Sequence, residues 1–361
     1  MENVIARSRF CNHKKAKMTT TTIHIGADIE DTYLKNGQEW MCRIVDAAHK
    51  FDTVIIAMTE GPSLEEIGHK GTKFLKILKE LCESNSWPLE KFQWSTPNLI
   101  QNKEIWPSIS ISNLAGHFLS AQQSQHVSSK IFDKTFGMFV GRSSWDRLLL
   151  ASYLATNYKA IAKQTYRNFL DAPASMINLD LDRLFWQTSS AGRLDVKLIH
   201  STMNFVSNLP LLLDDKHKDI THVQWNNGAV GEEIMAWYNE IFVDVVCEKM
   251  ITGQTFFPTE KTARPLATKT PFLIMASPNY IKNLRRLGFR SFGRFWDEGY
   301  DYQQGVQRVE SIQRIMDDLA KLNATQVHDL YTEIEPILEH NYKLYMDLTG
   351  EKILSTFGQK I

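Results

Sequence analysis

Residues 256–266 read Phe256-Phe257-Pro258-Thr259-Glu260-Lys261-Thr262-Ala263-Arg264-Pro265-Leu266. Thr259 follows a turn proline, and a threonine in this place is typical of the residue that caps the start of a helix. A helix start presents unbonded backbone N–H groups and the positive end of the helix dipole, which together favour a phosphate. Lys261 and Arg264 are three residues apart, so both fall on one side of the first turn. We therefore predict an anion-binding helix start, with Glu260 accepting hydrogen bonds from sugar hydroxyls.

The segments on either side of this helix favour a buried parallel sheet. Residues 271–276 are a continuous apolar run, residues 241–246 are apolar except for Asp244, and each segment reads as a buried strand. A strand, a helix and a second strand make a βαβ unit, in which ligands bind at the carboxyl ends of the strands. Glu248 and Glu260 would both lie at that edge. The simpler interpretation stays open, in which Glu260 only favours the helix dipole and the two cations are solvated.

Five motifs follow one another between Glu248 and Asp301. They are Thr259-Glu260-Lys261, Pro265, Pro271-Phe272, Leu284-Arg285-Arg286-Leu287-Gly288-Phe289-Arg290-Ser291-Phe292 and Trp296-Asp297-Glu298-Gly299-Tyr300-Asp301. This segment resembles the donor-binding half of fucosyltransferase-like enzymes, and among them the members encoded by viruses and phages. These enzymes have the GT-B arrangement, an α/β fold of two Rossmann-like domains facing across a cleft. The resemblance implies that Glu260 and Lys261 hold the ribose and diphosphate of a nucleotide-sugar donor.

A second cationic segment lies earlier in the chain. Residues 134–142 read as a strand, followed by Ser143 and Ser144 as candidate caps of a helix over 148–157. Arg142 and Arg147 flank this helix start, and the arginine fork suits a diphosphate. Related transferases carry an arginine after this strand that reaches the donor phosphates, which implies Arg147 first and Arg142 second. Alternatively, Asp146 pairs with one arginine and a serine only caps its own helix.

The first half of the chain repeats the alternation of strand and helix. Strands are predicted over 20–25, 53–58 and 91–95, with helices over 36–50 and 71–85 between them. Glu60 follows the second strand, at the edge where a Rossmann-like domain places an acceptor or a catalytic group. We predict Glu60 as the catalytic base. The alternative is that Glu60 and Ser63 only shape a turn and cap the next helix.

These patterns predict five segments. Residues 1–18 form a disordered basic lead, and residues 19–213 form an N-terminal, acceptor-side Rossmann-like domain. Residues 214–227 are a linker, because charge and Asn226-Asn227-Gly228 interrupt the periodicity. Residues 228–322 form the domain that binds the nucleotide-sugar. Residues 323–361 form C-terminal helices, with Pro336 kinking or dividing one of them, and we expect a C-terminal helix to cross onto the first domain.

Composition narrows the function classes. Lys plus Arg and Asp plus Glu are 41 each among 361 residues, so net charge makes no case for nucleic acid or an anionic membrane. No apolar stretch is long enough to span a bilayer. The four cysteines form no CxxC pair, which argues against a zinc site or a disulfide framework. We expect a cytoplasmic protein, in the host cytoplasm if it is viral.

The leading hypothesis is a nucleotide-sugar-dependent glycosyltransferase. We expect no metal and no cofactor, because Lys261 with Arg147 or Arg142 can balance the charge of the donor diphosphate. Lys261 and Glu60 are the predicted catalytic residues. The predicted donor-binding residues are Arg142, Arg147, Glu248, Thr259, Glu260, Lys261 and Arg264. The acceptor is a glycan or a modified nucleobase. Two alternatives remain: transfer to hydroxymethylated bases of viral DNA, and a non-catalytic protein that binds nucleotide-sugars.

Overall fold

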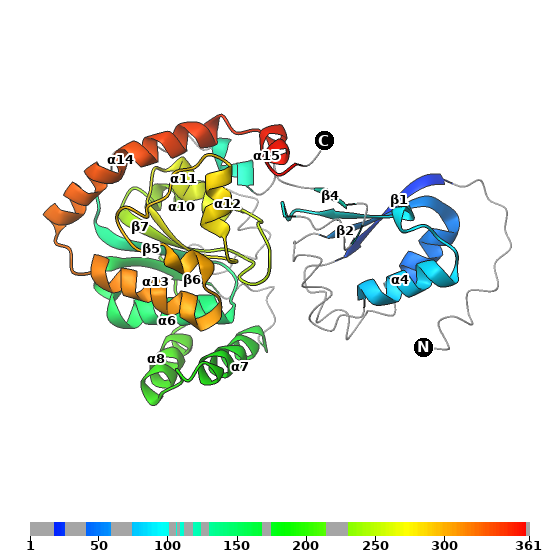
Figure 1. Ribbon diagram of the computed structural model, residues 1–361. Helices are drawn as coiled ribbons and strands as arrows, with labels where there is room; N and C mark the ends of the chain where they lie inside the picture. The colour runs from blue at the N-terminus through cyan, green and yellow to red at the C-terminus, as the bar shows by residue number, and fades with distance from the viewer. Residues whose placement is uncertain are drawn as a thin grey trace. The chain divides into compact units, whose positions relative to one another are not determined.

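Two separate parallel β-sheets organise the computed structural model, one in each of two units (Figure 1). The structure describes residues 18–25, 41–58, 74–100, 106, 109–111, 118–123, 130–167, 175–213 and 230–358. Unit 1 comprises Met1–Leu114, Gly253–Phe257 and Phe357–Ile361, and unit 2 comprises Ala115–Thr252 and Pro258–Thr356. The predicted α/β class with parallel strands is therefore confirmed.

Unit 1 contains four parallel strands in the spatial order β1-β2-β3-β4. They are β1 (Met18–Ile25), β2 (Phe51–Met58), β3 (Phe92–Thr96) and β4 (Ile109–Ile111). A helix over residues 41–50 and helix α4 (Phe74–Ser84) each connect consecutive strands, as parallel pairing requires. Two tryptophans fill the core: the rings of Trp94 and Trp106 are fully buried, 6.2 Å apart, and the Trp106 indole N–H donates to the carbonyl of Phe92.

Unit 2 contains four parallel strands in the order β6-β5-β7-β8. They are β5 (Lys134–Val140), β6 (Ala162–Tyr166), β7 (Ile241–Cys247) and β8 (Phe272–Met275). Every residue of β7 and β8 is buried, which explains why both segments are almost entirely apolar, with Asp244 of β7 as the exception.

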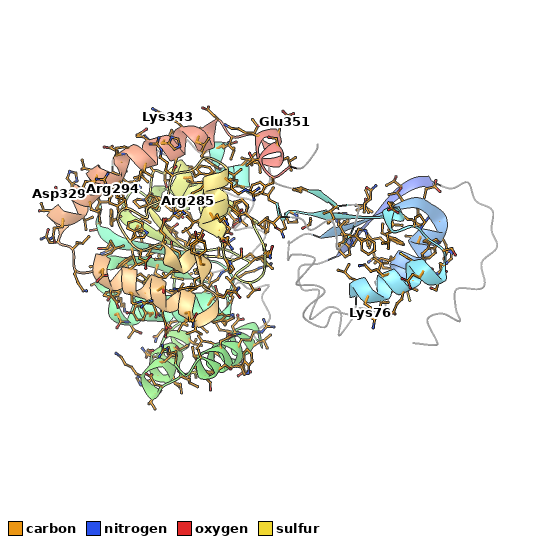
Figure 2. The ribbon with its side chains drawn as sticks, in the orientation of Figure 1. Lys76, Arg285, Arg294, Asp329, Lys343 and Glu351 are labelled. Atoms are coloured by element: carbon orange, nitrogen blue, oxygen red, sulfur yellow. The ribbon has the colours of Figure 1, made fainter. Side chains whose placement is uncertain are left out.

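The described helices of unit 2 pack around this sheet. They are α6 (Trp145–Asn157), α7 (Ser175–Ser190), α8 (Val196–Ser207), α10 (Val230–Trp237), α11 (Glu260–Ala267), α12 (Tyr280–Arg286), α13 (Gly305–Leu319), α14 (Ala324–Met346) and α15 (Gly350–Thr356). Short 3-10 turns are η2 (Leu89–Lys91) in unit 1 and η3 (Phe118–Gln123), η4 (Lys159–Ile161) and η6 (Gly299–Tyr302) in unit 2. Helix α6 packs against α13, and α11 packs against α14. Charged side chains such as Lys76 and Lys343 point outward from the helices (Figure 2).

The strand order of unit 2 places a topological switch point between β5 and β7. From β5 the chain crosses to β6 on one side, and it later returns to β7 on the other side of β5. Because the two connections diverge there, the carboxyl ends of β5 and β7 are the place where ligands bind in sheets of this kind. Residues 141–144 follow β5, and Glu248 follows β7. The switch point therefore marks these two segments as the candidate ligand-binding edge of the sheet.

The predicted boundary between the domains is wrong. Strands β5 and β6 pair with each other, and β5 also pairs with β7, so residues 134–166 belong to unit 2 and not to a first domain over 19–213. The strand over 134–142 was predicted but assigned to the first domain, and its partner β6, Ala162–Tyr166, is too polar to read as a buried strand. The predicted linker 214–227 lies outside the described residues, between two strands of one sheet. The predicted lead over 1–18 also falls outside them, except for Met18, which begins β1.

The C-terminal helices also differ from the prediction. Both α13 and α14 belong to unit 2, and Pro336 lies inside α14 without dividing it. The Tyr345 hydroxyl of α14 donates to the carbonyl of Phe118 over 2.7 Å, which fixes the end of this helix within unit 2. The chain joins unit 1 only from Phe357, whose ring centroid lies 5.4 Å from that of Phe256. Within the described ranges, no helix has the length and apolar character that crossing a bilayer requires.

Candidate functional site

Helix α11 begins as the sequence predicts. Thr259 is its N-cap with extended backbone angles, and its hydroxyl oxygen accepts a hydrogen bond from the backbone N–H of Lys261 over 3.3 Å. The first turn therefore carries Glu260 and Lys261 directly after the cap. Thr259 itself is only 3% exposed, so its side chain stabilises the turn from inside the protein and does not project into solvent.

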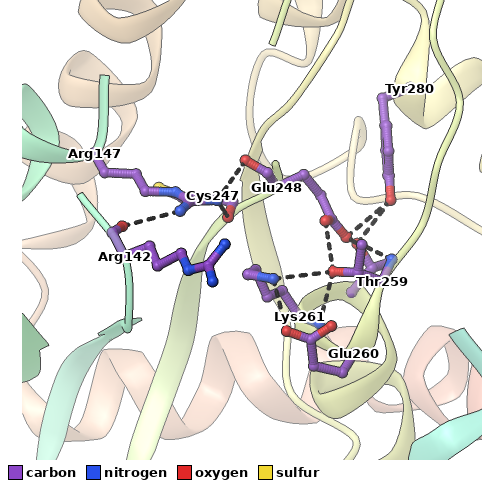
Figure 3. Close-up of polar contacts among 9 residues, drawn as sticks. Arg142, Arg147, Cys247, Glu248, Thr259, Glu260, Lys261 and Tyr280 are labelled. Atoms are coloured by element: carbon purple, nitrogen blue, oxygen red, sulfur yellow. Dashed lines mark hydrogen bonds and ion pairs between the residues drawn. The ribbon is translucent and has the colours of Figure 1, made fainter. Parts of the chain in front are cut away.

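Glu260 and Lys261 form an ion pair on this turn (Figure 3). The Lys261 Nζ lies 2.6 Å from the Glu260 Oε1, and it also donates to the Thr259 hydroxyl over 3.4 Å. The Lys261 side chain is 26% exposed and the Glu260 side chain is 29% exposed, so a ligand can reach both. Burial alone would raise the pKa of the Glu260 carboxyl, but the charges of Lys261 and Arg264 hold that pKa below its ordinary value. Glu260 is therefore a carboxylate that can accept hydrogen bonds.

Arg264 lies one turn further along α11. Its charge lowers the pKa of Glu260 and also opposes the rise in the pKa of buried Asp244 on β7. Arg264 thus acts electrostatically on two carboxyl groups of unit 2. The predicted direct contact of Arg264 with a donor stays a prediction.

Glu248 occupies a different environment from the one expected of a donor contact. It is 1% exposed, and its carboxylate accepts hydrogen bonds from the Thr259 N–H at 3.0 Å and the Thr259 hydroxyl at 2.7 Å. The hydroxyls of Thr262 and Tyr280 add further hydrogen bonds at 2.6 Å and 3.1 Å. Thr262 and Tyr280 were not predicted as site residues, because no local pattern connects either of them to Glu248.

Arg147 and Arg142 differ sharply in exposure. Arg147 is 7% exposed, and its guanidinium donates to the carbonyls of Arg142, Cys247 and Glu248 over 3.0, 3.2 and 3.0 Å. It therefore ties the segment after β5 to the end of β7 across the switch point. Arg142 is exposed, and Figure 3 shows its guanidinium and the Lys261 ammonium extending toward one another. Arg142, the second choice from sequence, is thus the arginine that a ligand can reach.

The alternative in which a serine side chain caps α6 is not confirmed: Ser144 is the N-cap of α6, but its side chain makes no capping hydrogen bond. Asp146 is 1% exposed, and its neighbour in sequence, Arg147, directs its Nη atoms to backbone carbonyls. Burial raises the pKa of the Asp146 carboxyl, and the charge of Arg147 only partly opposes that rise.

Taken together, unit 2 brings Arg142, Arg147, Thr259, Glu260 and Lys261 to the carboxyl ends of β5 and β7. The predicted catalytic base, Glu60, lies outside the described residues. Among the residues that the structure does describe, no three His, Cys, Asp or Glu side chains come together as a metal site. The arrangement offers fixed positive charge, a helix start and one carboxylate, which is the chemistry that recognises a phosphorylated, hydroxyl-bearing ligand.

Comparison with known proteins adds no relative, since no family model matches this chain and no curated protein matches it.

Proposed function

We propose that the protein is a glycosyltransferase that moves a sugar from a nucleotide-sugar donor to an acceptor hydroxyl without a metal. In this proposal the two units are the two Rossmann-like halves of a GT-B enzyme, and unit 2 binds the donor. The observation that carries the proposal is the capped start of α11, whose Lys261 extends toward Arg142 at the switch point of the unit 2 sheet. Two converging cations beside a helix start favour a diphosphate.

Each residue then has a defined task. Lys261 and Arg142 contact the diphosphate, and the N-terminus of α11 adds its dipole. Negative charge grows on the departing nucleoside diphosphate as the glycosidic bond breaks, so these cations stabilise the transition state more than the ground state. Glu260 accepts hydrogen bonds from donor hydroxyls. Arg147 does not contact the donor in this proposal. It holds the backbone of the site in place, because its Nη atoms already donate to backbone carbonyls.

The acceptor half of the proposal rests on sequence. Glu60 follows the carboxyl end of β2, and in an inverting reaction a carboxylate in that position removes the proton of the acceptor hydroxyl. The equal numbers of acidic and basic residues favour a glycan over DNA as the acceptor, because DNA binding draws on an excess of positive charge.

A thermal-shift screen against UDP-, GDP- and CDP-sugars tests donor binding, since a ligand that binds only the folded state raises the melting temperature. We expect one nucleotide series to stabilise the protein and to release nucleoside diphosphate when acceptors are supplied. Lys261→Ala should weaken both effects, whereas Lys282→Ala should weaken neither. Lys282 is the matched control, because it is an exposed lysine in the first turn of the neighbouring helix α12. Stabilisation by none of the three series would refute the proposal.

A further inference from the structure

The carboxylate of Glu248 is the most densely hydrogen-bonded group beside the candidate site. It sits directly after β7, and its four donors all come from α11 or from the helix after β8 (Figure 3). Oε1 accepts from the Thr259 N–H, the Thr262 hydroxyl and the Tyr280 hydroxyl, and Oε2 accepts from the Thr259 hydroxyl. Burying a carboxylate is costly unless its oxygens are satisfied, and here they are.

The donors define which part of the helix is held. Thr259 is the cap of α11, and Thr262 is the third residue of its first turn. Glu260 and Lys261 are the two residues between them. Glu248 therefore fixes the backbone on both sides of the pair that we propose to contact the donor, while its own carboxylate stays out of solvent.

This helix needs such an anchor. It has eight residues with Pro265 among them, and an isolated helix of that length is unstable in water. Its position therefore depends on tertiary contacts. The main chain of Glu248 is itself braced, because its N–H donates to the carbonyl of Met275 and its own carbonyl accepts from Arg147. The anchor is thus continuous with β8 and with the segment after β5.

Tyr280 remains a hydrogen-bond donor under ordinary conditions. Burial, and then the adjacent Glu248 carboxylate, raise the pKa of the Tyr280 hydroxyl well above its ordinary value. Its oxygen also lies 2.9 Å from the Thr262 hydroxyl, so the two donors are linked to each other as well as to the carboxylate.

We infer that Glu248 is a positioning residue: it holds Thr259 and Thr262 so that Glu260 and Lys261 meet the donor in a productive orientation, and it does not touch the donor itself. This inference rests on the proposed transferase function. If Glu248 influences turnover, it does so by keeping Lys261 in place. A displacement of about 1 Å in a catalytic group can lower turnover by about 100-fold.

Glu248→Gln tests the inference with little change of shape. The carboxamide retains one acceptor oxygen, but its NH₂ group replaces the other oxygen and faces N–H or O–H groups that can no longer donate to it. This mismatch disturbs the turn. Glu298→Gln is the matched control, because Glu298 is also a buried carboxylate of unit 2 that accepts from a backbone N–H, that of Phe292 at 2.8 Å. We expect Glu248→Gln to lower kcat by about 10-fold to 100-fold, and Glu298→Gln to leave kcat within about twofold of the parent, with both assayed below their melting temperatures. Thr262→Val and Tyr280→Phe each remove one of the four hydrogen bonds to the Glu248 carboxylate and should lower kcat less.

Amide hydrogen exchange of the peptide over residues 256–266 measures how firmly the backbone of this turn is held, and it requires no substrate. Faster exchange in Glu248→Gln, and parental exchange in Glu298→Gln, is the expected result. Parental kcat and parental exchange in Glu248→Gln would overturn the inference. A rise in donor KM with parental kcat would also overturn it, since that result indicates direct donor contact. If the parental protein turned over no donor, the proposed function would fail, and the exchange measurement alone would decide whether Glu248 holds this turn.

Discussion

Lys261→Ala removes the side chain on which the proposed chemistry depends most. The Lys261 ammonium bonds to Glu260 over 2.6 Å and makes a long contact of 3.4 Å to the Thr259 hydroxyl. The variant loses both contacts, and of the two cations that lower the pKa of the Glu260 carboxyl it keeps only Arg264.

The Lys261→Ala substitution is expected to lower the free energy of unfolding only slightly and kcat strongly. Because both members of the pair are more than a quarter exposed, the pair contributes only about 0–1 kcal/mol to the free energy of unfolding. A charge-stabilising contact to a developing anion contributes about 2.7–4 kcal/mol, which corresponds to about 100-fold to 1,000-fold in kcat. We therefore expect a loss of at least about 100-fold in kcat, with the melting temperature lowered by no more than a few degrees.

Steady-state kinetics at saturating donor, with circular dichroism on the same samples, measure the two quantities. Lys282→Ala controls for the loss of a lysine from a helix start in the same unit. The reasoning is refuted if Lys261→Ala retains near-parental kcat, because the charged first turn would then be only a solvated helix end. A loss of kcat that merely follows a loss of folded protein would refute it too.

Four further outcomes follow from the same structure. Glu260→Ala should raise the donor KM by about tenfold to a hundredfold with kcat nearly unchanged, because a hydroxyl contact made equally in both states supports binding alone; initial rates test this, and an equal fall in kcat contradicts it. Donor turnover should persist in EDTA, because fixed cations already face the phosphates in the proposed site; loss on chelation that Mn²⁺ restores contradicts it. Burial raises the pKa of the Asp244 carboxyl from 3.8 to about 7, although its hydrogen bond from Tyr238 and two nearby cations oppose the rise. The folded state then holds a proton that the unfolded state has lost, so stability falls as pH rises from about 4 to about 7, and Asp244→Asn should remove that fall in melting curves; parallel curves for parent and variant contradict it. Arg308→Met should lower the free energy of unfolding by about 3–5 kcal/mol in urea titrations, because Arg308 is fully buried and pairs with buried Asp301; a loss below about 1 kcal/mol contradicts it.

The apolar strands could be located from sequence, whereas the polar strand could not. The segments over 241–246 and 271–276 correspond to β7 and β8, because strands buried on both faces are mostly apolar; Asp244 is the one charged residue among them. In β6 the buried residues include Gln164 and Thr165. Gln164 is tolerated there because its amide donates to the carbonyl of Ala151 over 3.0 Å, a tertiary contact that periodicity does not encode. Because this strand was missed, the strand over 134–142 had no predicted partner that would assign it to the second sheet.

Local contacts of the site were likewise predictable, and distant ones were not. Thr259 caps α11 through an atom two residues away, so the sequence window contained both partners. The role of Glu248 depends on Thr262 and Tyr280, which are 14 and 32 residues distant in sequence. A glutamate after a strand can face a ligand or anchor a helix, and the number of donors around it decides which. The sequence analysis likewise preferred Arg147 to Arg142 as the phosphate contact. The backbone carbonyls that hold the Arg147 side chain include those of Cys247 and Glu248, which are distant in sequence, so only the fold reveals them.

The position of Lys261 allows this one lysine to serve two partners. Lys261 is paired with its own neighbour in sequence, so it need only rotate its side chain to face a phosphate, and the partly exposed pair that it leaves contributes about 1 kcal/mol or less. Glu260 gains in the same step, because an oxygen that accepted from Lys261 becomes available to a donor hydroxyl. Such an exchange requires the backbone beneath both side chains to stay fixed while they move. The buried bonds of Glu248 to the residues before and after the pair supply that fixed support.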